Sequence, residues 1–386
     1  MASEIYLDNS ATTQPYREVV EEMCKTLTDT YGNPSSLHRK GLESERKIEQ
    51  AREIIAKTIG VKKQEIFFTS GGTEANNLAV QGIAKAYRMR GKHIISSQIE
   101  HKSVLDVLSH LEEEGYRVTY LPVDEEGRVR PSDLANALQD DTILVSIMYT
   151  NNETGAIQPI DEIGEILTRH RKVLFHVDAV QAYGKVPLRL KENRIDLLTM
   201  SAHKIHGPKG VGALYVRSGV HLQPLVFGGG QEHGVRSGTE NVAGIAGFAK
   251  AVQMTFQNLE ETRKHMCKLR DALIAGIRRE IPDARINTPL GEHAAPHIVN
   301  VSFPGVRGEV LVHALETEGI YVSTGSACTS KEDKYSHVLA AMGLSEPELI
   351  GSIRLSFAKE NTPEEVETTV QLLKKIVNDL RVLSRR

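Results

Sequence analysis

The sequence predicts an α/β protein in which a mostly parallel β-sheet is covered by helices and a smaller α+β domain follows. From about residue 64, apolar runs of strand length alternate with amphipathic runs of helix length, which is the pattern of such a sheet. Several strand-like runs are apolar throughout, as expected for strands buried on both faces. The chain has 386 residues, more than a single hydrophobic core usually serves, so we expect two domains.

The strands and helices of the larger domain can be placed in chain order. Apolar runs predict strands over 66–69, 93–96, 118–121, 143–147, 173–177 and 197–200. Helical spacing of apolar residues predicts helices over 74–90, 103–114 and 160–170, and a further helix that starts at Ser132-Asp133. A long helical stretch then follows Glu240 and continues to about Arg279. This order is typical of a doubly wound sheet.

The order of strands and helices changes after that stretch, which indicates a second domain. Strands are expected over 298–303 and 353–357, a helix over 308–318, and a last helix from Pro363. We expect residues 15–257 to form the larger domain and residues 1–14 with 258–386 the smaller one, which would carry Cys328 and Arg354.

Composition excludes several classes of protein. Hydrophobic residues make up 40% and charged residues 25% of the chain, and the formal net charge is -3, as in an ordinary soluble protein. There is no basic excess that would indicate direct nucleic-acid binding, and no apolar run approaches the roughly 18 residues of a membrane span. The first residues lack the layout of a signal peptide, so we expect a cytoplasmic protein.

The three cysteines of the chain lie in different settings. Three thiols make a disulfide framework implausible, so we expect them to be reduced. Cys24 and Cys267 lie in stretches with helical character and show no special chemistry. Cys328 lies in a run of small residues, 323–330, that cannot form a packed helix face, and it is the cysteine that we expect to be exposed.

A candidate reactive lysine, Lys204, lies in the glycine-bounded segment 201–210. A desolvated lysine loses its proton more readily, so its free amine can attack a carbonyl near neutral pH. Pyridoxal phosphate is the usual carbonyl compound in such a site. Taken alone, the Ser-Ala-His-Lys tetrapeptide favours an ordinary surface lysine in a loop, so the neighbouring motifs have to decide.

Further polar residues follow the predicted strands. Asp178 ends strand 173–177, where it could meet a pyridine nitrogen, with Gln181 on the ring hydroxyl, although such an Asp is equally a helix cap. The glycine turn before Thr73 could bind a phosphate at a helix N-terminus, or Thr73 could simply cap that helix. His101 could stack on a flat cofactor and transfer a proton, or be structural.

A metal site is not expected. His203 and His206 lie three residues apart on either side of Lys204, but no cysteine or carboxylate completes a zinc-binding set.

Taken together, these motifs resemble the class V aminotransferase family, and within it the cysteine desulfurases. The resemblance covers essentially the whole chain. It rests on the segments 6–13 (YLDNSATT), 31–38 (YGNPSSLH), 72–77 (GTEANN), 151–155 (NNETG), 176–181 (HVDAVQ), 201–210 (SAHKIHGPKG), 236–239 (RSGT) and 325–330 (GSACTS).

The resemblance implies a type I pyridoxal-phosphate-dependent transferase fold with a seven-stranded sheet, acting as a homodimer with sites at the subunit interface. Lys204 would hold the cofactor and Asp178 would meet its ring nitrogen. The other implied contacts are Gln181 and Asn152 at the ring hydroxyl side, His101 stacked on the ring, Gly72, Thr73, Ser201 and His203 at the phosphate, Thr239 from the other subunit, and Arg354 with Asn152 at the substrate.

The reaction implied by the resemblance converts L-cysteine to L-alanine and leaves the sulfur on Cys328 as a persulfide. His101 is the better candidate for proton transfer, because only Lys331 and Lys334 lie near Cys328 in the sequence. Selenocysteine lysis remains open, as does a class V aminotransferase or lyase in which Cys328 is not catalytic, or a catalytically silent interaction protein.

The protein that accepts the sulfur is also left open. Relatives that supply iron–sulfur scaffolds tend to carry a longer C-terminal tail than this chain. The acceptor is therefore expected to be either such a scaffold or a tRNA-thiolation enzyme.

Overall fold

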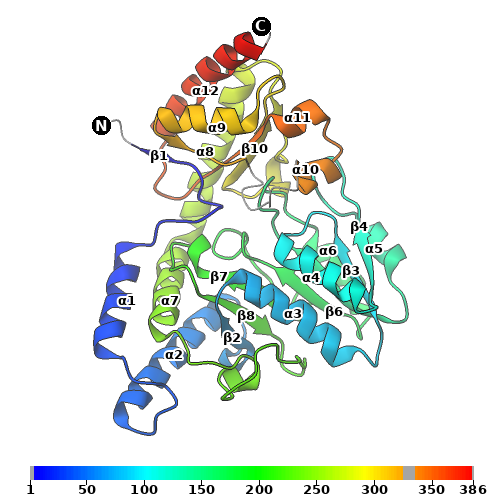
Figure 1. Ribbon diagram of the computed structural model, residues 1–386, viewed down its shortest axis with the longest axis vertical. Coiled ribbons are helices and arrows are strands. Elements are labelled where there is room, and N and C mark those ends of the chain that lie inside the picture. Colours follow the sequence, from blue (N-terminus) through cyan, green and yellow to red (C-terminus); the bar gives the residue numbers. More distant parts are fainter. Residues whose placement is uncertain (1–3, 325–334, 385–386) are drawn as a thin grey trace.

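The computed structural model describes residues 4–324 and 335–384. Its largest sheet has seven strands in the order β2-β8-β7-β6-β5-β3-β4 (Figure 1). These are β2 (Ile66–Thr69), β3 (His93–Ser97), β4 (Arg117–Leu121), β5 (Thr142–Met148), β6 (Leu174–Asp178), β7 (Leu197–Ser201) and β8 (Gly212–Val216). β8 pairs antiparallel with both β2 and β7, and the other six strands run in one direction. The predicted mostly parallel sheet is confirmed.

β8 is the strand of this sheet that the sequence pattern did not predict. It follows β7 after a connection over residues 202–211, which contains Lys204. A connection of this length is too short for the helical crossover that a parallel neighbour needs, so the chain returns antiparallel. The Lys204 turn therefore lies at the carboxyl end of β7 and connects β7 to its neighbour β8.

Helices cover both faces of the sheet. Successive strand residues point to opposite faces, as with Ile94 and Ile95, which belong to different hydrophobic clusters. One face packs against α3 (Gly72–Tyr87) and α4 (Lys102–Glu113). The other packs against α2 (Arg39–Thr58), α5 (Pro131–Ala137), α6 (Ile160–Thr168) and α7 (Val242–Gln257), and α1 (Arg17–Asp29) lies beside α7.

The expectation of one long helical stretch to about residue 279 needs a correction. The structure has two helices, α7 and α8 (Leu259–Glu280), and Asn258 between them leaves the helical conformation at φ -130° and ψ 35°. The break lies where the chain passes from one hydrophobic cluster to another. Phe248 of α7 belongs to the core of the large sheet, whereas Leu273 of α8 belongs to a second core.

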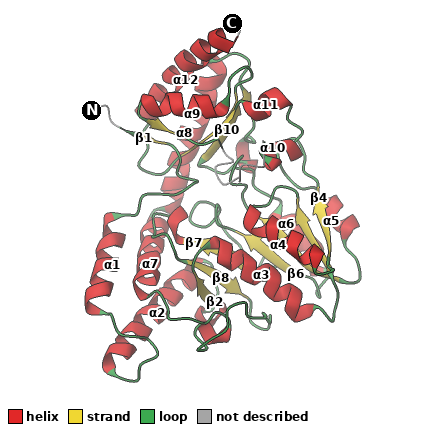
Figure 2. Cartoon of the chain, in the orientation of Figure 1, coloured by secondary structure: helices red, strands yellow, loops and turns green. Residues whose placement is uncertain are grey.

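This second core lies in the upper part of Figures 1 and 2. Its strands are β10 (Ile298–Ser302), β12 (Ser352–Ser356) and β9 (Arg285–Ile286) in one antiparallel sheet, and β1 (Ile5–Tyr6) with β11 (Ile320–Tyr321) in a parallel pair. Its helices are α8, α9 (Gly308–Thr317) and α12 (Pro363–Ser384), and the short α10 (His337–Ala341) and α11 (Glu346–Ile350) lie nearby.

The start of the chain packs with its end, because Ile5 and Leu7 belong to this second core. The division into domains at residues 15 and 258 stays a prediction. None of the helices in the described part of the chain combines the length and the apolar character that crossing a membrane requires.

A buried ion pair ties the loop that precedes Thr239 to the large sheet. The guanidinium of Arg52 on α2 donates to both carboxylate oxygens of Glu232 at 2.8 and 2.9 Å, and the backbone N–H of Phe68 on β2 donates to the same carboxylate at 2.9 Å. Both charged side chains are nearly inaccessible. Glu232 also has a positive φ of 48°, an unusual conformation that these three bonds maintain.

We predict that Glu232→Ala lowers the free energy of unfolding by about 3 kcal/mol, because it leaves a buried guanidinium without its main partner. Denaturant titration measures the change. The matched control is Arg17→Ala, which removes an exposed pair with Glu21 and should change the free energy by less than about 0.5 kcal/mol. Equal effects of the two variants would contradict this account.

Candidate active site

A cavity of about 320 Å³ opens at the edge of the sheet where the six co-directional strands end. Ligand-facing residues collect at this edge in parallel sheets. The predicted residues that line it are Gly72 and Thr73 after β2, His101 after β3, Asn152 after β5, Asp178 and Gln181 at and after β6, Ser201, His203 and Lys204 at and after β7, and Arg354 on β12. The fold thus brings these predicted residues together.

Two predicted residues are not placed in this cavity. Thr239 is exposed and is not part of the described lining. Cys328 lies outside the described residues. The described residues on either side of it are nevertheless close to the cavity, because Ser323 pairs with Arg354 through two backbone hydrogen bonds and His337 lines the cavity directly.

The amine of Lys204 faces the N-terminal segment of the chain. Lys204 ends the short helical turn Ala202–Lys204, and its Nζ donates to the carbonyl oxygens of Ser10 at 2.6 Å and Ala11 at 2.7 Å. The same segment holds the turn itself, since the backbone N–H and the hydroxyl of Thr13 both donate to the carbonyl of His203 at 2.9 Å. Lys204 is partly buried, unlike a lysine on a solvated loop.

A chain of hydrogen bonds connects Asp178 to His101. Asn76 Nδ2 donates to Asp178 Oδ2 at 2.7 Å and to Ser103 Oγ at 2.8 Å, and that hydroxyl lies 2.8 Å from His101 Nδ1. The other Asp178 oxygen, Oδ1, accepts from the backbone N–H of Val180 at 2.9 Å. Asp178 therefore caps the turn after β6 and also faces the cavity.

The tautomer of His101 follows from the start of α4. Its Nδ1 accepts from the backbone N–H of Ser103 at 3.1 Å, so in the neutral ring the proton lies on Nε2. Burial lowers the pKa of His101, and the charge of Lys204 lowers it further, against the opposing effect of Asp178. The wall of the cavity thus carries a flat imidazole that favours the neutral form.

An anion-binding cradle lies at the start of α3. No side chain caps this helix, so its first N–H groups are available at the positive end of the helix dipole. Gly72 is required there, because a Cβ would come within 2.8 Å of a methyl group of Val180. Ser201 Oγ is buried beside the cradle with no hydrogen-bond partner among the described residues. A phosphate group fits this set of donors.

The two histidines beside Lys204 have protein partners. His203 Nδ1 lies 3.2 Å from Thr12 Oγ1, and His206 Nδ1 lies 2.9 Å from the carbonyl oxygen of Gln14. Burial lowers the pKa of both rings to about 4. No group of three or more His, Cys, Asp or Glu side chains in the described part of the chain could hold a metal ion.

These residues fit pyridoxal phosphate. One cavity contains a lysine amine, a hydrogen-bonded carboxylate, a flat neutral imidazole and an anion cradle. A family model described as aminotransferase class-V matches residues 5–369. The chain belongs to the class V aminotransferase family.

Relatives of the class V family match the chain over its full length. It is 48% identical over 385 residues to a protein named cysteine desulfurase IscS from Clostridium botulinum (strain Hall), a match that covers 100% of this chain and 97% of that relative. A solved structure named NifS-like protein has a TM-score of 0.92 and 43% identity, and covers 98% of this chain and 100% of its own. A structure of SspA in complex with cysteine has a TM-score of 0.82 and 35% identity, and the match covers 93% of this chain and 100% of that one.

These matches confirm the predicted type I pyridoxal-phosphate-dependent transferase fold. Within the class V family the chain groups with the cysteine desulfurases, and its cofactor is pyridoxal phosphate.

Arg354 has partners that the sequence did not reveal. Its Nη2 donates to Asp8 Oδ1 at 2.8 Å and its Nη1 to the carbonyl oxygen of Asn152 at 2.9 Å. The side chain is 5% exposed, so this is not an ordinary surface ion pair. Nε is buried and has no partner among the described residues. The guanidinium is therefore fixed at the cavity from two sides.

The sequence did not indicate a role for several other residues of the site. Ser10 and Asn76 belong to motifs that carried the resemblance, so the signal was present, but their contacts depend on long-range packing. Glu153 lines the cavity and belongs to the motif 151–155, whereas His337 lines it without any local signal. Burial raises the pKa of Glu153 to about 7, and its carboxyl accepts from Ser336 Oγ at 2.5 Å.

Glu100, the residue before His101, is a fully buried carboxyl. Its Oε1 accepts from the Ser97 hydroxyl at 2.6 Å and from the Met148 N–H at 3.0 Å, and its Oε2 has no partner among the described residues. Burial raises the pKa of Glu100 from 4.5 to about 8, and Asp178 adds to this. Glu100 is therefore protonated in the folded protein at neutral pH.

We predict that Glu100 makes stability depend on pH. Below about pH 4.5 the Glu100 carboxyl is protonated in both the folded and the unfolded state, and its contribution to stability is complete. As the pH rises towards 8 this contribution is lost, because the carboxyl ionises first in the unfolded state. Glu100→Gln, which cannot ionise, should flatten the decline in unfolding free energy between those pH values. Denaturant titrations over this range measure it. The exposed control Glu125→Gln should keep the wild-type slope, and a Glu100→Gln slope as steep as wild type would refute the assignment.

Proposed function

We propose that this chain converts L-cysteine to L-alanine and takes up the sulfur on Cys328 as a persulfide. The observation that carries the proposal is the cavity that brings Lys204, Asp178 and Arg354 together. The full-length relatives named cysteine desulfurase support the reaction, and the related structure that contains cysteine supports the substrate.

The residues of the cavity hold the cofactor in this proposal. Lys204 carries it, Asp178 meets its ring nitrogen, and His101 stacks on the ring. Gln181 and Asn152 flank the ring hydroxyl, and Gly72, Thr73, Ser201 and His203 bind the phosphate. Bound pyridoxal phosphate supplies an electron sink for the charge that develops on the substrate.

The hydrogen bonds of Asp178 and His101 suit these roles. Both oxygens of Asp178 accept N–H groups, from Asn76 and Val180, and these two bonds fix the orientation of the carboxyl group that would meet the ring nitrogen. His101 Nδ1 is occupied by Ser103, so His101 exchanges protons through Nε2. Asn76 and Ser103 thus fix the carboxylate and the imidazole relative to each other.

Arg354 binds the substrate carboxylate in this proposal. A guanidinium recognises a carboxylate through paired N–H donors, and Asp8 and the Asn152 carbonyl fix its plane. The free Nε donor lies on the same guanidinium. Because Asp8 already neutralises part of the charge of Arg354, the incoming carboxylate shares or replaces that contact.

Cys328 is the proposed sulfur acceptor. The Cys328 thiolate attacks the sulfur of L-cysteine, an S–S bond forms, the carbon–sulfur bond breaks, and the carbon takes a proton to give L-alanine, so that cysteine and one thiol become alanine and one persulfide. On either side of the segment that contains Cys328, Ser323 pairs with Arg354 of the cavity and His337 lines the cavity. Cys24 and Cys267 lie on α1 and α8, outside its described lining.

We predict that Cys328→Ala loses almost all alanine formation from cysteine and keeps the cofactor absorbance, because only the sulfur acceptor is removed. Alanine and sulfide assays on the purified protein measure this. Cys24→Ala is the matched control, and this exposed cysteine should be dispensable. Undiminished alanine formation by Cys328→Ala would exclude the persulfide route and favour a class V lyase or aminotransferase. A preference for selenocysteine would indicate selenocysteine lysis.

We predict that Arg354→Lys raises the KM for cysteine by about 10- to 100-fold, because a lysine cannot donate two parallel hydrogen bonds to a carboxylate. Cofactor absorbance should stay unchanged. The matched control is Arg285→Lys on β9 of the same three-stranded sheet, where Arg285 pairs with Glu348. Steady-state kinetics measure both variants, and an unchanged KM for Arg354→Lys would rule out this role.

We also propose that the protein is a cytoplasmic homodimer in which Thr239 completes the phosphate site of the other subunit. The exposure of Thr239, and of large apolar side chains such as Leu37 and Phe227, supports a subunit interface. Light scattering tests the oligomeric state, and a monomeric active enzyme would contradict it.

The sulfur acceptor is proposed to be an iron–sulfur scaffold or a tRNA-thiolation enzyme. Incubation with radiolabelled cysteine and each purified acceptor separates the two, because label should move from Cys328 to one of them. Efficient loading of the scaffold would exclude the thiolation enzyme as the sole acceptor.

A further inference from the structure

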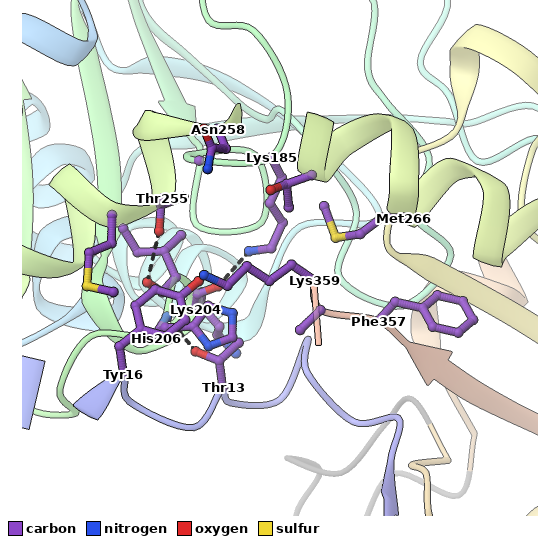
Figure 3. A pocket seen from close by; sticks show the side chains of 15 residues that line it. Thr13, Tyr16, Lys185, Lys204, His206, Thr255, Asn258, Met266, Phe357 and Lys359 are labelled. Carbon is purple, nitrogen blue, oxygen red and sulfur yellow. Dashed lines mark hydrogen bonds between the residues drawn. The ribbon is translucent and has the colours of Figure 1, made fainter. Parts of the chain in front are cut away.

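The Lys204 turn has hydrogen-bond partners in two cavities. A second cavity, of about 70 Å³, contains Lys185, whose Nζ donates to the carbonyl oxygen of Lys204 at 2.7 Å (Figure 3). In the candidate active site, Lys204 Nζ donates to the carbonyl oxygen of Ser10 at 2.6 Å. The Ser10 carbonyl accepts a further hydrogen bond from Gln181 Nε2 at 2.9 Å. Gln181 and Lys204 therefore share one acceptor.

The hydrogen bonds of Gln181 determine which end of its amide faces which partner. A carbonyl oxygen only accepts, so the amide nitrogen of Gln181 faces Ser10 and the amide oxygen is left for another partner. That partner is His297, whose Nε2 lies 3.2 Å from Gln181 Oε1. Because Oε1 only accepts, His297 donates to it through a proton on Nε2.

His297 is fully buried and has the protonation state that this bond requires. Burial lowers the pKa of His297 well below its usual range, and the charges of nearby lysines and arginines lower it further, so the ring is neutral near pH 7. Its one proton lies on Nε2, which leaves Nδ1 without a proton. Nδ1 has no partner among the described residues, so a proton there would be a buried donor without an acceptor.

The second core fixes the position of His297. The residue precedes β10, and its backbone carbonyl accepts from the N–H of Phe357 after β12 at 2.8 Å. Ser10 is fixed by the same sheet, because its backbone N–H donates to Ser356 Oγ on β12 at 2.8 Å. His297 is not part of the described lining of either cavity. It therefore contacts the candidate active site only through Gln181, as far as the described hydrogen bonds show.

Gln181 has one hydrogen-bond donor left for a ligand. Its Nε2 carries two hydrogens, and Ser10 is the one partner of Nε2 among the described residues. The side chain lines the candidate active site, so the second N–H is available to a group bound there. A reversed amide would turn Oε1 towards the Ser10 carbonyl, where two acceptors would repel each other.

We propose that His297 is a positioning residue whose hydrogen bond to Gln181 Oε1 keeps the Gln181 amide nitrogen available to donate to the ring hydroxyl oxygen of pyridoxal phosphate. The inference rests on the proposed contact between Gln181 and the cofactor. It goes beyond that contact because it assigns the direction of the hydrogen bond, and because it gives a function to a residue of the second core that does not line the described cavity.

Cofactor affinity tests this proposal without cysteine. The dissociation constant for pyridoxal phosphate is measured by titrating the protein freed of its cofactor, with the absorbance of the lysine-bound form as the signal. His297→Phe and His297→Met have no donor and should each raise this constant by about 3- to 10-fold, the effect of one hydrogen bond. His297→Gln carries an amide N–H of similar reach and should return the constant to within about 2-fold of the wild-type value.

A double-mutant cycle separates this role from a general effect on packing. In a Gln181→Met background, His297→Phe should cause no further loss of affinity, because the side chain through which His297 acts is absent. The matched control is His93→Phe. His93 is also buried, lies at the start of β3, bonds to Thr142 and Thr119, and is not part of the described lining of either cavity. This control should leave the constant within about 2-fold of wild type.

Three results would overturn the proposal. They are an unchanged cofactor affinity in His297→Phe and His297→Met, an equal loss in the Gln181→Met background, and a loss that His297→Gln fails to restore. A wild-type protein that binds no cofactor would overturn this inference together with the cofactor assignment. Normal binding and coupling without alanine formation from cysteine would contradict only the proposed function.

Discussion

The constraint on which the rest of the structure depends is the attachment of the Lys204 turn to the N-terminal segment. Thr13 bonds to the carbonyl of His203, and the amine of Lys204 bonds to the carbonyls of Ser10 and Ala11. The same segment begins in β1, and its residues Ile5 and Leu7 pack in the second core. One stretch of backbone therefore connects the two cores and closes the candidate active site between them.

This arrangement explains why the site draws on so many parts of the chain. The six co-directional strands bring their carboxyl ends to one edge, which supplies the anion cradle, the imidazole, the carboxylate and the lysine. The second core supplies Arg354, whose orientation depends on Asp8 from the N-terminal segment and on the carbonyl of Asn152. Any change that moves the N-terminal segment therefore affects both the proposed cofactor-binding side and the proposed substrate-binding side of the cavity.

The sequence predicted the fold class and most of the site lining, because both leave local patterns. Buried parallel strands are mostly apolar; Asp178 ends one such strand, and Lys204 lies just after the end of another. β8 was not predicted, and its antiparallel direction follows from the short connection that precedes it. The bonds between Asp8 and Arg354, and between Lys185 and Lys204, join residues whose contact depends on the packed fold. The buried state of Glu100 follows likewise from packing that no local pattern encodes.

The central claim is that Lys204, and no neighbouring lysine, carries the cofactor. Borohydride reduction of the holoenzyme makes the bond between the cofactor and its lysine permanent, and peptide mass spectrometry then locates it. Two other lysines serve as internal comparisons for the site of attachment. Lys185 contacts the Lys204 carbonyl in the fold, and Lys209 lies in the same segment, 201–210. We predict the added mass on Lys204 alone. Added mass on Lys185 or Lys209, or reduction that leaves every lysine unmodified, would contradict this account.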